Sequence, residues 1–391
     1  MFMGGVISDF LAIFKENKEM IFERIVKIFL FIILYIIYFK LLTPSEFGIF
    51  NVIFLYMVFE RGFLQNFLPC YVKYTKEYRK IAFLQVLVSI ILAFGLFVTM
   101  WLIGLSNYVW VVVLDCLFAN IIFFSQSLAV ARENYKLKAW ISLSSDVTFF
   151  ILAFILVFSL KVIGILMAFM LSSLPALIFP IAREFKPQIP NINEIRKYIG
   201  LYLSNVIGTL HRKAYSFLEP TIYYMVLPAA ALGIFYCNFR IATVSSTTVL
   251  MSIGMSIQPK VARKEYKKVI MYTGFAVFLL FLAYLFAVIV IKLGILKILF
   301  PMYKFYPDLL AIMFLGVSFF VGVTIFSNIL IYNENYKPML IFGFLNITIW
   351  LILTLMTRSI YGIAVAFLLS NEVEFICIVS YVYKKYIRKS L

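Results

Sequence analysis

Residues 164–172 read GILMAFMLS and residues 362–370 read GIAVAFLLS, so one apolar motif occurs twice, 198 residues apart. Three more motifs recur in the same order, at offsets of 185, 188 and 201 residues. They are LTPSEFGIF at 42–50 with LPAAALGIF at 227–235, KEYRK at 76–80 with KEYKK at 264–268, and ENYK at 133–136 with ENYK at 334–337. Such nearly constant offsets predict that the chain contains two copies of one structural unit.

Both copies have the composition of membrane-spanning helices. Hydrophobic residues make up 64% of the 391 residues and charged residues 14%, whereas soluble domains are about 45–50% apolar. A helix needs about 20 apolar residues to cross a bilayer, and the sequence offers twelve candidate runs, six in each copy. The runs are 25–42, 47–72, 81–105, 108–131, 139–160, 163–181, 198–226, 230–257, 269–291, 308–332, 338–356 and 360–383.

We therefore expect an all-α integral membrane protein with twelve transmembrane helices. Because six spans return the chain to the side where it began, the two six-helix lobes would be related by a pseudo-twofold axis along the membrane normal. Parallel repeats of this kind are a transporter architecture. The expected segments are an amphipathic cytoplasmic segment at 1–24, an N-lobe at 25–186, a cytoplasmic linker at 187–197, and a C-lobe with a basic tail at 198–391.

The positive charges predict the topology. When the N-terminus is placed inside, 25 of the 35 Lys and Arg residues fall in inner segments, six fall in outer segments and four lie within spans. Such a bias is typical of the cytoplasmic face of a membrane protein, so we expect both termini in the cytoplasm. The same sorting accounts for the net charge of +17 without a nucleic-acid partner.

Motifs for catalysis are missing from the sequence. The four cysteines stand singly and His211 is the one histidine, which argues against a disulfide framework and against a multi-histidine metal site. The sequence has no Walker A motif and no Gly-x-Ser-x-Gly. We expect a protein that is not an enzyme, so a membrane-bound polymerase, ligase or glycosyltransferase is the weaker interpretation.

Three stretches resemble Wzx-type polysaccharide (O-antigen) flippases of the MOP superfamily. Residues 42–50 are similar to the motif between the first two helices of that family, and residues 125–137 resemble its junction of helices 4 and 5. Residues 227–242 resemble its helix 7–8 hairpin. Two features depart from the family: residues 211–213, which read HRK, carry more charge than is usual there, and Glu219 stands where Asp is common.

The resemblance implies a flippase in a bacterial inner membrane. Such a protein moves an undecaprenyl-linked oligosaccharide, attached through a phosphate or pyrophosphate, from the inner to the outer leaflet. Such a flippase works by alternating access and needs no cofactor. Its transport can be coupled to a gradient of H⁺ or Na⁺. The implied partners are the lipid bilayer, the lipid-linked substrate and the polysaccharide polymerase machinery.

Charged side chains inside spans are the candidate site, because they are costly in a bilayer and normally face a bundle interior or a wet cavity. Arginine and lysine suit a phosphate headgroup, so we expect four cations to line a central cavity. These cations are Arg61, Arg212, Lys213 and Arg240. Five further residues are candidates for ion or proton coupling: His211, Glu60, Glu372, Glu374 and Glu219. The structural alternative is that Glu60 or Glu372 pairs with Arg61, Lys213 or Arg240 and locks the lobes together.

Two other transporter classes share parts of this pattern. A MATE-like drug antiporter has the same fold, but its cargo is usually cationic and a cationic cavity would repel it. A major-facilitator carrier also has twelve helices, but the loop after the second span, residues 73–80, lacks its Gly/Asp/Arg-rich signature. Four tryptophans near span ends are predicted to anchor the helices at the membrane interface. They are Trp101, Trp110, Trp140 and Trp350.

Overall fold

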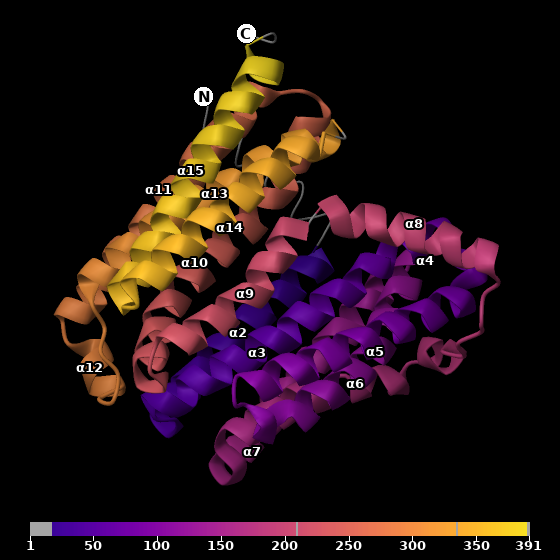
Figure 1. Cartoon of the computed structure of the whole chain (residues 1–391), viewed down its shortest axis with the longest axis horizontal. Coiled ribbons are helices and arrows are strands. Elements are labelled where there is room, and N and C mark those ends of the chain that lie inside the picture. Colours follow the sequence, from indigo (N-terminus) through magenta and orange to yellow (C-terminus); the bar gives the residue numbers. More distant parts are fainter. Residues whose placement is uncertain (1–17, 209, 334, 389–391) are drawn as a thin grey trace. The chain divides into compact units, whose positions relative to one another are not determined.

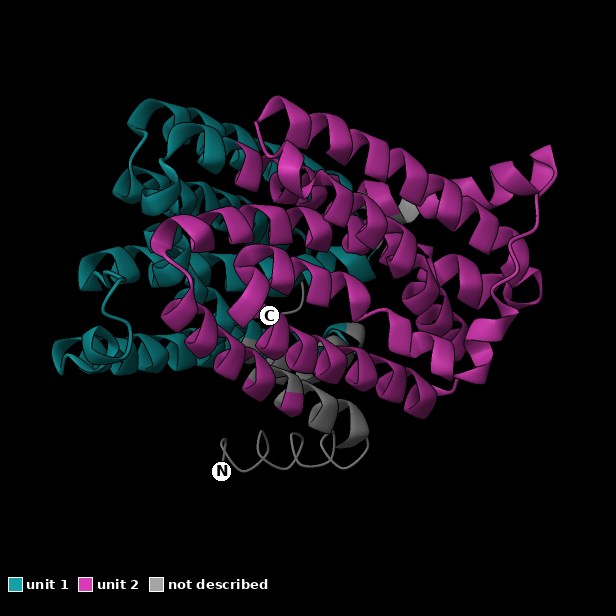
Figure 2. Cartoon of the chain, turned by 90° about the horizontal axis from the view of Figure 1, so that it is seen from below, with its two compact units in different colours: residues 1–17, 222–391 teal, residues 18–221 magenta. Residues whose placement is uncertain are grey.

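The structure, a computed structural model, describes residues 18–208, 210–333 and 335–388. The described residues form α-helices joined by short turns and 3₁₀ segments, with no β-strand among them (Figure 1). Residues 1–17 of the predicted N-terminal amphipathic segment lie outside the described residues. The helices divide into two compact units, Lys18–Thr221 (unit 2) and Ile222–Leu391 together with residues 1–17 (unit 1), which Figure 2 distinguishes by colour. The lobe boundaries predicted from the repeat, with a linker at 187–197, stay a prediction.

Unit 2 is built from consecutive helices, of which α3 (Pro44–Leu64) and α7 (Tyr135–Leu171) begin at a side-chain cap. Thr43 caps one of them: its Oγ1 accepts a hydrogen bond from the Glu46 amide at 3.3 Å, and Glu46 Oε2 accepts one from the Thr43 amide at 2.8 Å. This reciprocal capping box, with Pro44 in the first turn, explains the TPSEF part of the repeated motif. The helices are α2 (Lys18–Leu41), α3 (Pro44–Leu64), α4 (Leu68–Lys73), α5 (Tyr78–Leu102), α6 (Val109–Ala131), α7 (Tyr135–Leu171) and α8 (Ile192–Gly208), and α9 (Leu210–Val226) crosses the boundary into unit 1.

Unit 1 continues with a second set of packed helices. They are α10 (Ala229–Ala262), α11 (Tyr266–Lys292), α12 (Ile295–Leu299), α13 (Pro307–Tyr332), α14 (Lys337–Thr357) and α15 (Ile360–Val382). Helix α15 packs along both α13 and α14 (Figure 1). Gly316 of α13 lies directly under the Phe367 ring of α15, where a Cβ atom would come within 2.7 Å of the ring, so the two helices approach closely because the residue is glycine.

The repeated apolar motif follows a residue with a positive φ in both units. Lys161 has a φ of 47°, and it interrupts α7 at the point where the sequence predicts the loop between two spans. Arg358 has a φ of 43° between α14 and α15. In each case the glycine that opens the motif, Gly164 or Gly362, lies so close to the preceding residues that a Cβ would overlap them. The two turns share a positive φ but differ in ψ, which is −123° at Lys161 and 37° at Arg358.

Eight helical segments among the described residues are long and apolar enough to cross a membrane. They cover nine of the twelve predicted spans, because the longest segment, Tyr135–Ile178, contains two predicted spans. The eight segments are Pro44–Lys73, Thr75–Leu102, Ser106–Ala131, Tyr135–Ile178, Tyr266–Lys292, Pro307–Tyr332, Lys337–Thr357 and Ile360–Ile387. The chain is therefore a multi-pass membrane protein.

Three predicted spans are not among these eight segments. Span 25–42 lies almost entirely in α2 (Lys18–Leu41), which includes the apolar stretch Phe29–Leu41. Span 198–226 contains described residues of α8 (Ile192–Gly208) and α9 (Leu210–Val226), and span 230–257 lies in α10.

One of the predicted interfacial anchors is wrong. Trp101, Trp110 and Trp140 are exposed on the surface of unit 2, as expected for anchors, but Trp350 is fully buried in unit 1. Its indole Nε1 donates a hydrogen bond to the Tyr223 hydroxyl at 3.0 Å. An indole N–H that has a buried partner no longer needs the membrane interface, so Trp350 is part of the packing of unit 1.

Candidate functional site

The strongest polar contact in the interior of unit 2 joins α3 to α6. Arg61 Nη2 lies 2.5 Å from Asp115 Oδ1, and Arg61 Nε lies 3.1 Å from Asp115 Oδ2. The Asp115 side chain is fully buried and the Arg61 side chain is 12% exposed. The contact is thus a bidentate ion pair removed from solvent, the geometry that suits a guanidinium and a carboxylate best.

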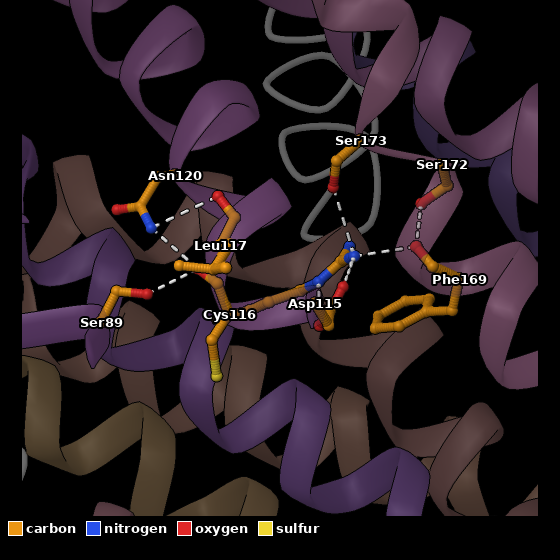
Figure 3. A network of polar contacts seen from close by, with 9 residues as sticks. Ser89, Asp115, Cys116, Leu117, Asn120, Phe169, Ser172 and Ser173 are labelled. Carbon is orange, nitrogen blue, oxygen red and sulfur yellow. Dashed lines mark hydrogen bonds and ion pairs between the residues drawn. The ribbon is translucent and has the colours of Figure 1, made fainter. Parts of the chain in front are cut away.

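The Arg61 guanidinium has further partners at the end of α7 (Figure 3). Nη2 donates to the Phe169 carbonyl at 2.8 Å and to Ser173 Oγ at 3.3 Å. The guanidinium also lies over the Phe169 ring, with Cζ 3.7 Å from the ring centroid, which is a cation–π contact. Arg61 therefore connects α3, α6 and the end of α7 within one unit.

Glu60, the chain neighbour of Arg61, is buried differently. Its side chain is fully buried, and neither carboxylate oxygen has a nitrogen or oxygen hydrogen-bond partner within the described part of the chain. Its surroundings are the Asp115 carboxylate, the Arg61 guanidinium and the Cys116 thiol, which is a weak donor. A buried carboxylate without such bonds is costly in its charged form.

A chain of neutral polar groups continues from this cluster through α5 and α6. The Tyr71 hydroxyl donates to Gln85 Oε1 at 2.9 Å, and Gln85 Nε2 donates to the Asn120 carbonyl at 3.1 Å. Asn120 Nδ2 and Ser89 Oγ both donate to the Cys116 carbonyl, at 2.7 and 2.5 Å (Figure 3). These bonds satisfy the polar atoms that would otherwise be stranded among apolar side chains.

Helix α9 lies along α3 in the opposite direction, through residues spaced one turn apart. The Tyr56 hydroxyl and Thr221 Oγ1 are 2.7 Å apart, and the rings of Phe59 and Phe217 have centroids 5.3 Å apart. At the other end of the contact, Lys213 Nζ lies 5.4 Å from the centroid of the Phe63 ring. The order of these pairs shows that α9 turns one face toward α3, and Lys213 is on that face.

The Lys213 ammonium rests against the backbone of α3 at a glycine. A Cβ atom on Gly62 would lie 2.5 Å from Lys213 Nζ, so the ammonium occupies the space that any larger residue would fill. Lys213 is half-buried, and no carboxylate of the described residues forms an ion pair with it. The Phe63 ring and Gly62 of α3 are two of its described neighbours.

The other candidates on α9 lie apart from Lys213. His211 is buried, and its Nδ1 has no hydrogen-bond partner among the described residues. Arg212 is half-buried, and Glu219 is buried farther along the helix. Three consecutive residues point about 100° apart on a helix, so His211, Arg212 and Lys213 face three different directions.

The candidates in unit 1 belong to α10 and α15. Arg240 of α10 and Glu372 of α15 are half-buried. Glu374 is buried, and its Oε2 accepts a hydrogen bond from Asn346 Nδ2 of α14 at 2.6 Å. Within the residues that the structure describes, no group of three or more His, Cys, Asp or Glu side chains is arranged to hold a metal ion.

The structure brings two of the predicted residues, Glu60 and Arg61, together with a third that the sequence analysis left out. Asp115 is the partner of Arg61, whereas the structural alternative names Glu60 or Glu372 for that role. The signal was present in the sequence: Asp115 stands in the apolar run VWVVVLDCLFAN, where an acid needs a cation, and Arg61 is a cation within another span of the same unit.

Comparison with known proteins shows the fold. No protein-family model matches the sequence, and no curated protein matches it. Among solved structures, an inward-facing multidrug-resistance MATE-family transporter of the MOP superfamily is similar, with 13% identity, 92% of this chain and 94% of that chain covered, and a TM-score of 0.70.

Two other solved structures are similar over most of their length. The lipid II flippase MurJ in an inward closed conformation has 15% identity, with 94% of this chain and 87% of that chain covered and a TM-score of 0.68. A MOP-superfamily transporter from Pyrococcus furiosus, described by a binding pocket of reversed polarity, has 12% identity, with 96% and 97% covered and a TM-score of 0.59. The chain therefore has the all-helical, two-lobed fold of MOP-superfamily transporters.

Proposed function

We propose that the chain is a lipid flippase of the Wzx type, which carries a polyprenyl-linked oligosaccharide from the inner to the outer leaflet of a bacterial inner membrane. The observation that carries the proposal is Lys213, a half-buried lysine in a helix of a transporter fold with no carboxylate partner among the described residues. A cation in such surroundings is costly unless an anion joins it. The phosphate of a lipid-linked sugar supplies that anion.

The described ion pairs support different roles for the predicted cations, some structural and some in ligand binding. Arg61 already has a carboxylate, a carbonyl and a hydroxyl as partners, so we assign it to the internal structure of unit 2. Lys213 is available to an anionic ligand. Arg212 and Arg240, both half-buried, remain proposed headgroup ligands on the strength of the sequence.

Alternating access by the two lobes, both termini in the cytoplasm and coupling to H⁺ or Na⁺ are parts of the same proposal. The similarity to a lipid II flippase favours a lipid-linked cargo. The similarity to MATE-family transporters keeps a drug antiporter as the competing function, and the charge of the cargo distinguishes the two. A half-buried lysine attracts an anionic phosphate and repels a cationic drug.

Reconstitution tests the proposal directly. Purified protein is inserted into vesicles that contain a fluorescent polyprenyl-diphosphate oligosaccharide, and the fraction of the probe exposed to a membrane-impermeant quencher is followed over time. We expect protein-dependent movement that Lys213→Met slows at least tenfold. Probe movement no faster than in empty vesicles, combined with export of a cationic dye from the same preparation, would replace the flippase with the antiporter.

A test in the host complements it. Deletion of the gene is expected to abolish surface polysaccharide, while the lipid-linked repeat unit stays in the membrane and is confined to the inner leaflet. Normal surface polysaccharide in the deletion strain contradicts the proposal.

A further inference from the structure

Gly62 and Glu60 lie on nearly opposite sides of α3. Residues 60 and 62 point about 200° apart on a helix. Glu60 lies beside Asp115 and Cys116 of α6, whereas Gly62 lies under Lys213 of α9. Lys213 thus contacts α3 at Gly62, about 200° around the helix from Glu60.

Gly62 fixes where the lysine charge lies. With a Cβ at this position only 2.5 Å from Nζ, an alanine would push the ammonium away by about 1 Å to reach an ordinary contact distance. A lysine side chain is flexible and adapts to such a change, so the helix would still form. The position of the positive charge relative to the Phe63 ring would change.

We propose that Gly62 is a specificity-determining position, which seats the Lys213 ammonium beside the Phe63 ring and so forms a subsite for a phosphate group attached to an apolar chain. The inference rests on the proposed function and deepens it, because it states which part of the substrate binds here. The ammonium binds phosphate oxygens as a compact point charge. The rings of Phe63, Phe59 and Phe217, which line the same side of α3 and α9, accommodate the apolar part next to the phosphate.

The geometry also explains why a lysine suits this seat better than an arginine. A planar guanidinium is wider than an ammonium and presents its donors in a rigid fork. The Lys213 ammonium lies where a Cβ of Gly62 would be, and its Nζ is 5.4 Å from the centroid of the Phe63 ring. Lys213→Arg keeps the charge but cannot place it at the same point, and so separates the effect of charge from that of position.

The test uses farnesyl diphosphate and farnesol as a matched pair of soluble probes, which share the chain and differ in the diphosphate. Binding to the purified full chain in detergent is measured by calorimetry. We expect farnesyl diphosphate to bind the unmodified protein at least tenfold more tightly than farnesol. Gly62→Ala should weaken farnesyl diphosphate binding about tenfold and leave farnesol binding unchanged, and Lys213→Met should abolish the preference for the diphosphate.

A double-mutant cycle shows whether Gly62 acts through the lysine. In the Lys213→Met background, Gly62→Ala is expected to have no further effect on binding of either probe. Gly95→Ala is the matched control, because Gly95 is also inside a helix but has open space where its Cβ would go. Both alanine variants should unfold at or above the temperature of the unmodified protein, because alanine favours helix over glycine.

The outcomes separate the two proposals. If the unmodified protein binds farnesyl diphosphate and farnesol equally, the proposed function and this subsite both fail. A second outcome is that the unmodified protein prefers the diphosphate while Gly62→Ala binds both probes as Gly95→Ala does. A third is that Gly62→Ala weakens binding equally with and without Lys213. In either of these two cases the proposed function stands and the role of Gly62 is overturned.

Discussion

Arg61 of α3 and Asp115 of α6 form a bidentate ion pair, with Nη2 2.5 Å from Oδ1, in the interior of unit 2. The pair neutralises a charge that the sequence alone assigned to substrate binding. A guanidinium that also donates to the Phe169 carbonyl and to Ser173 has few donors left for a ligand. Arg61 is therefore better explained as a support for the helices around it.

The first prediction concerns the stability that depends on this pair. Asp115→Leu leaves the Arg61 charge buried without its carboxylate, and removing one member of a buried pair typically costs about 3–5 kcal/mol. We expect Asp115→Leu and Arg61→Met each to lower the unfolding temperature strongly. Thermal unfolding in detergent, followed with a thiol-reactive dye, measures the change, since Cys70, Cys116 and Cys237 are free and buried.

The double variant Arg61→Met/Asp115→Leu is the decisive control. Replacing a whole buried pair by apolar side chains of similar volume is often neutral or stabilising, so the double variant should recover most of the lost stability. If it is as unstable as the two single variants added together, the two side chains act independently and the pair is not the source of the effect.

The second prediction concerns Glu60, whose two carboxylate oxygens lack nitrogen or oxygen partners in the described residues. Glu60→Gln removes a charge that is costly to bury and keeps the shape, so stability should stay the same or rise. Glu46→Gln is the matched control on the same helix. It removes the charge from a carboxylate that caps the helix and pairs with Lys161 at 2.7 Å, so it should lower stability slightly.

The same variant tests the coupling role that the sequence suggests for Glu60. Transport by the unmodified protein is expected to respond to a pH gradient across the vesicle, and transport by Glu60→Gln to lose that response while still running down a substrate gradient. An unchanged response of the variant assigns coupling to another group.

Much of the fold was predictable because apolar runs, capping residues and internal repeats are local features. Thr43, Pro44 and Glu46 define the start of α3 within four residues of sequence. The break at Lys161 coincides with the loop expected between two spans. Such features need no knowledge of which helices are neighbours.

The site was harder to predict because it depends on how helices are rotated against one another. Residues 61 and 115 are 54 positions apart, and their pairing requires that both side chains point into one interface. The sequence does not indicate that Gly62 lies under Lys213, because the role of a glycine in a helix depends on which side chain packs against it. Trp350 was mistaken for an interfacial anchor for the same reason: its partner, Tyr223, lies on another helix.

The third prediction is a pH effect at the edge of unit 2. Glu184 Oε2 and Arg132 Nη2 are 2.6 Å apart, and this hydrogen bond holds the pKa of the Glu184 carboxyl below its usual value of 4.5. A carboxyl whose pKa is lower in the folded state stabilises the fold above its unfolded pKa, and the contribution is lost as the pH falls through the folded pKa. Both side chains are about a third exposed or more, so the effect should stay under about 1 kcal/mol.

Unfolding temperatures at about pH 6.5 and at about pH 2, well below the usual carboxyl pKa, measure this contribution. Glu184→Gln should lower the unfolding temperature by one or two degrees at the higher pH and make no difference at the lower one. Arg132→Gln should behave in the same way, because either change removes the pair. A difference from the unmodified protein that persists at the lower pH points to packing as its cause.

The fourth prediction compares the two glycines that open the repeated motif. A Cβ on Gly164 would overlap the backbone of Leu156, which cannot move without distorting α7. A Cβ on Gly362 would instead overlap the Thr357 Cβ, which no side-chain rotation can move. Thr357 is the last residue of α14, where the backbone shifts more easily than inside α7. Overpacking in a tight interior typically costs about 1–3 kcal/mol. We expect Gly164→Ala to destabilise the protein toward the upper end of that range, and Gly362→Ala to cost clearly less.

Gly274→Ala provides the baseline, since Gly274 lies inside α11 with open space around its Cβ position. It should raise the unfolding temperature slightly through helix propensity alone. The expected order of unfolding temperatures is therefore Gly274→Ala, then Gly362→Ala, then Gly164→Ala. Equal losses at Gly164 and Gly362 would mean that the duplicated motif imposes the same constraint in both units. The backbone contact of Gly164 would then not be what makes its turn sensitive to substitution.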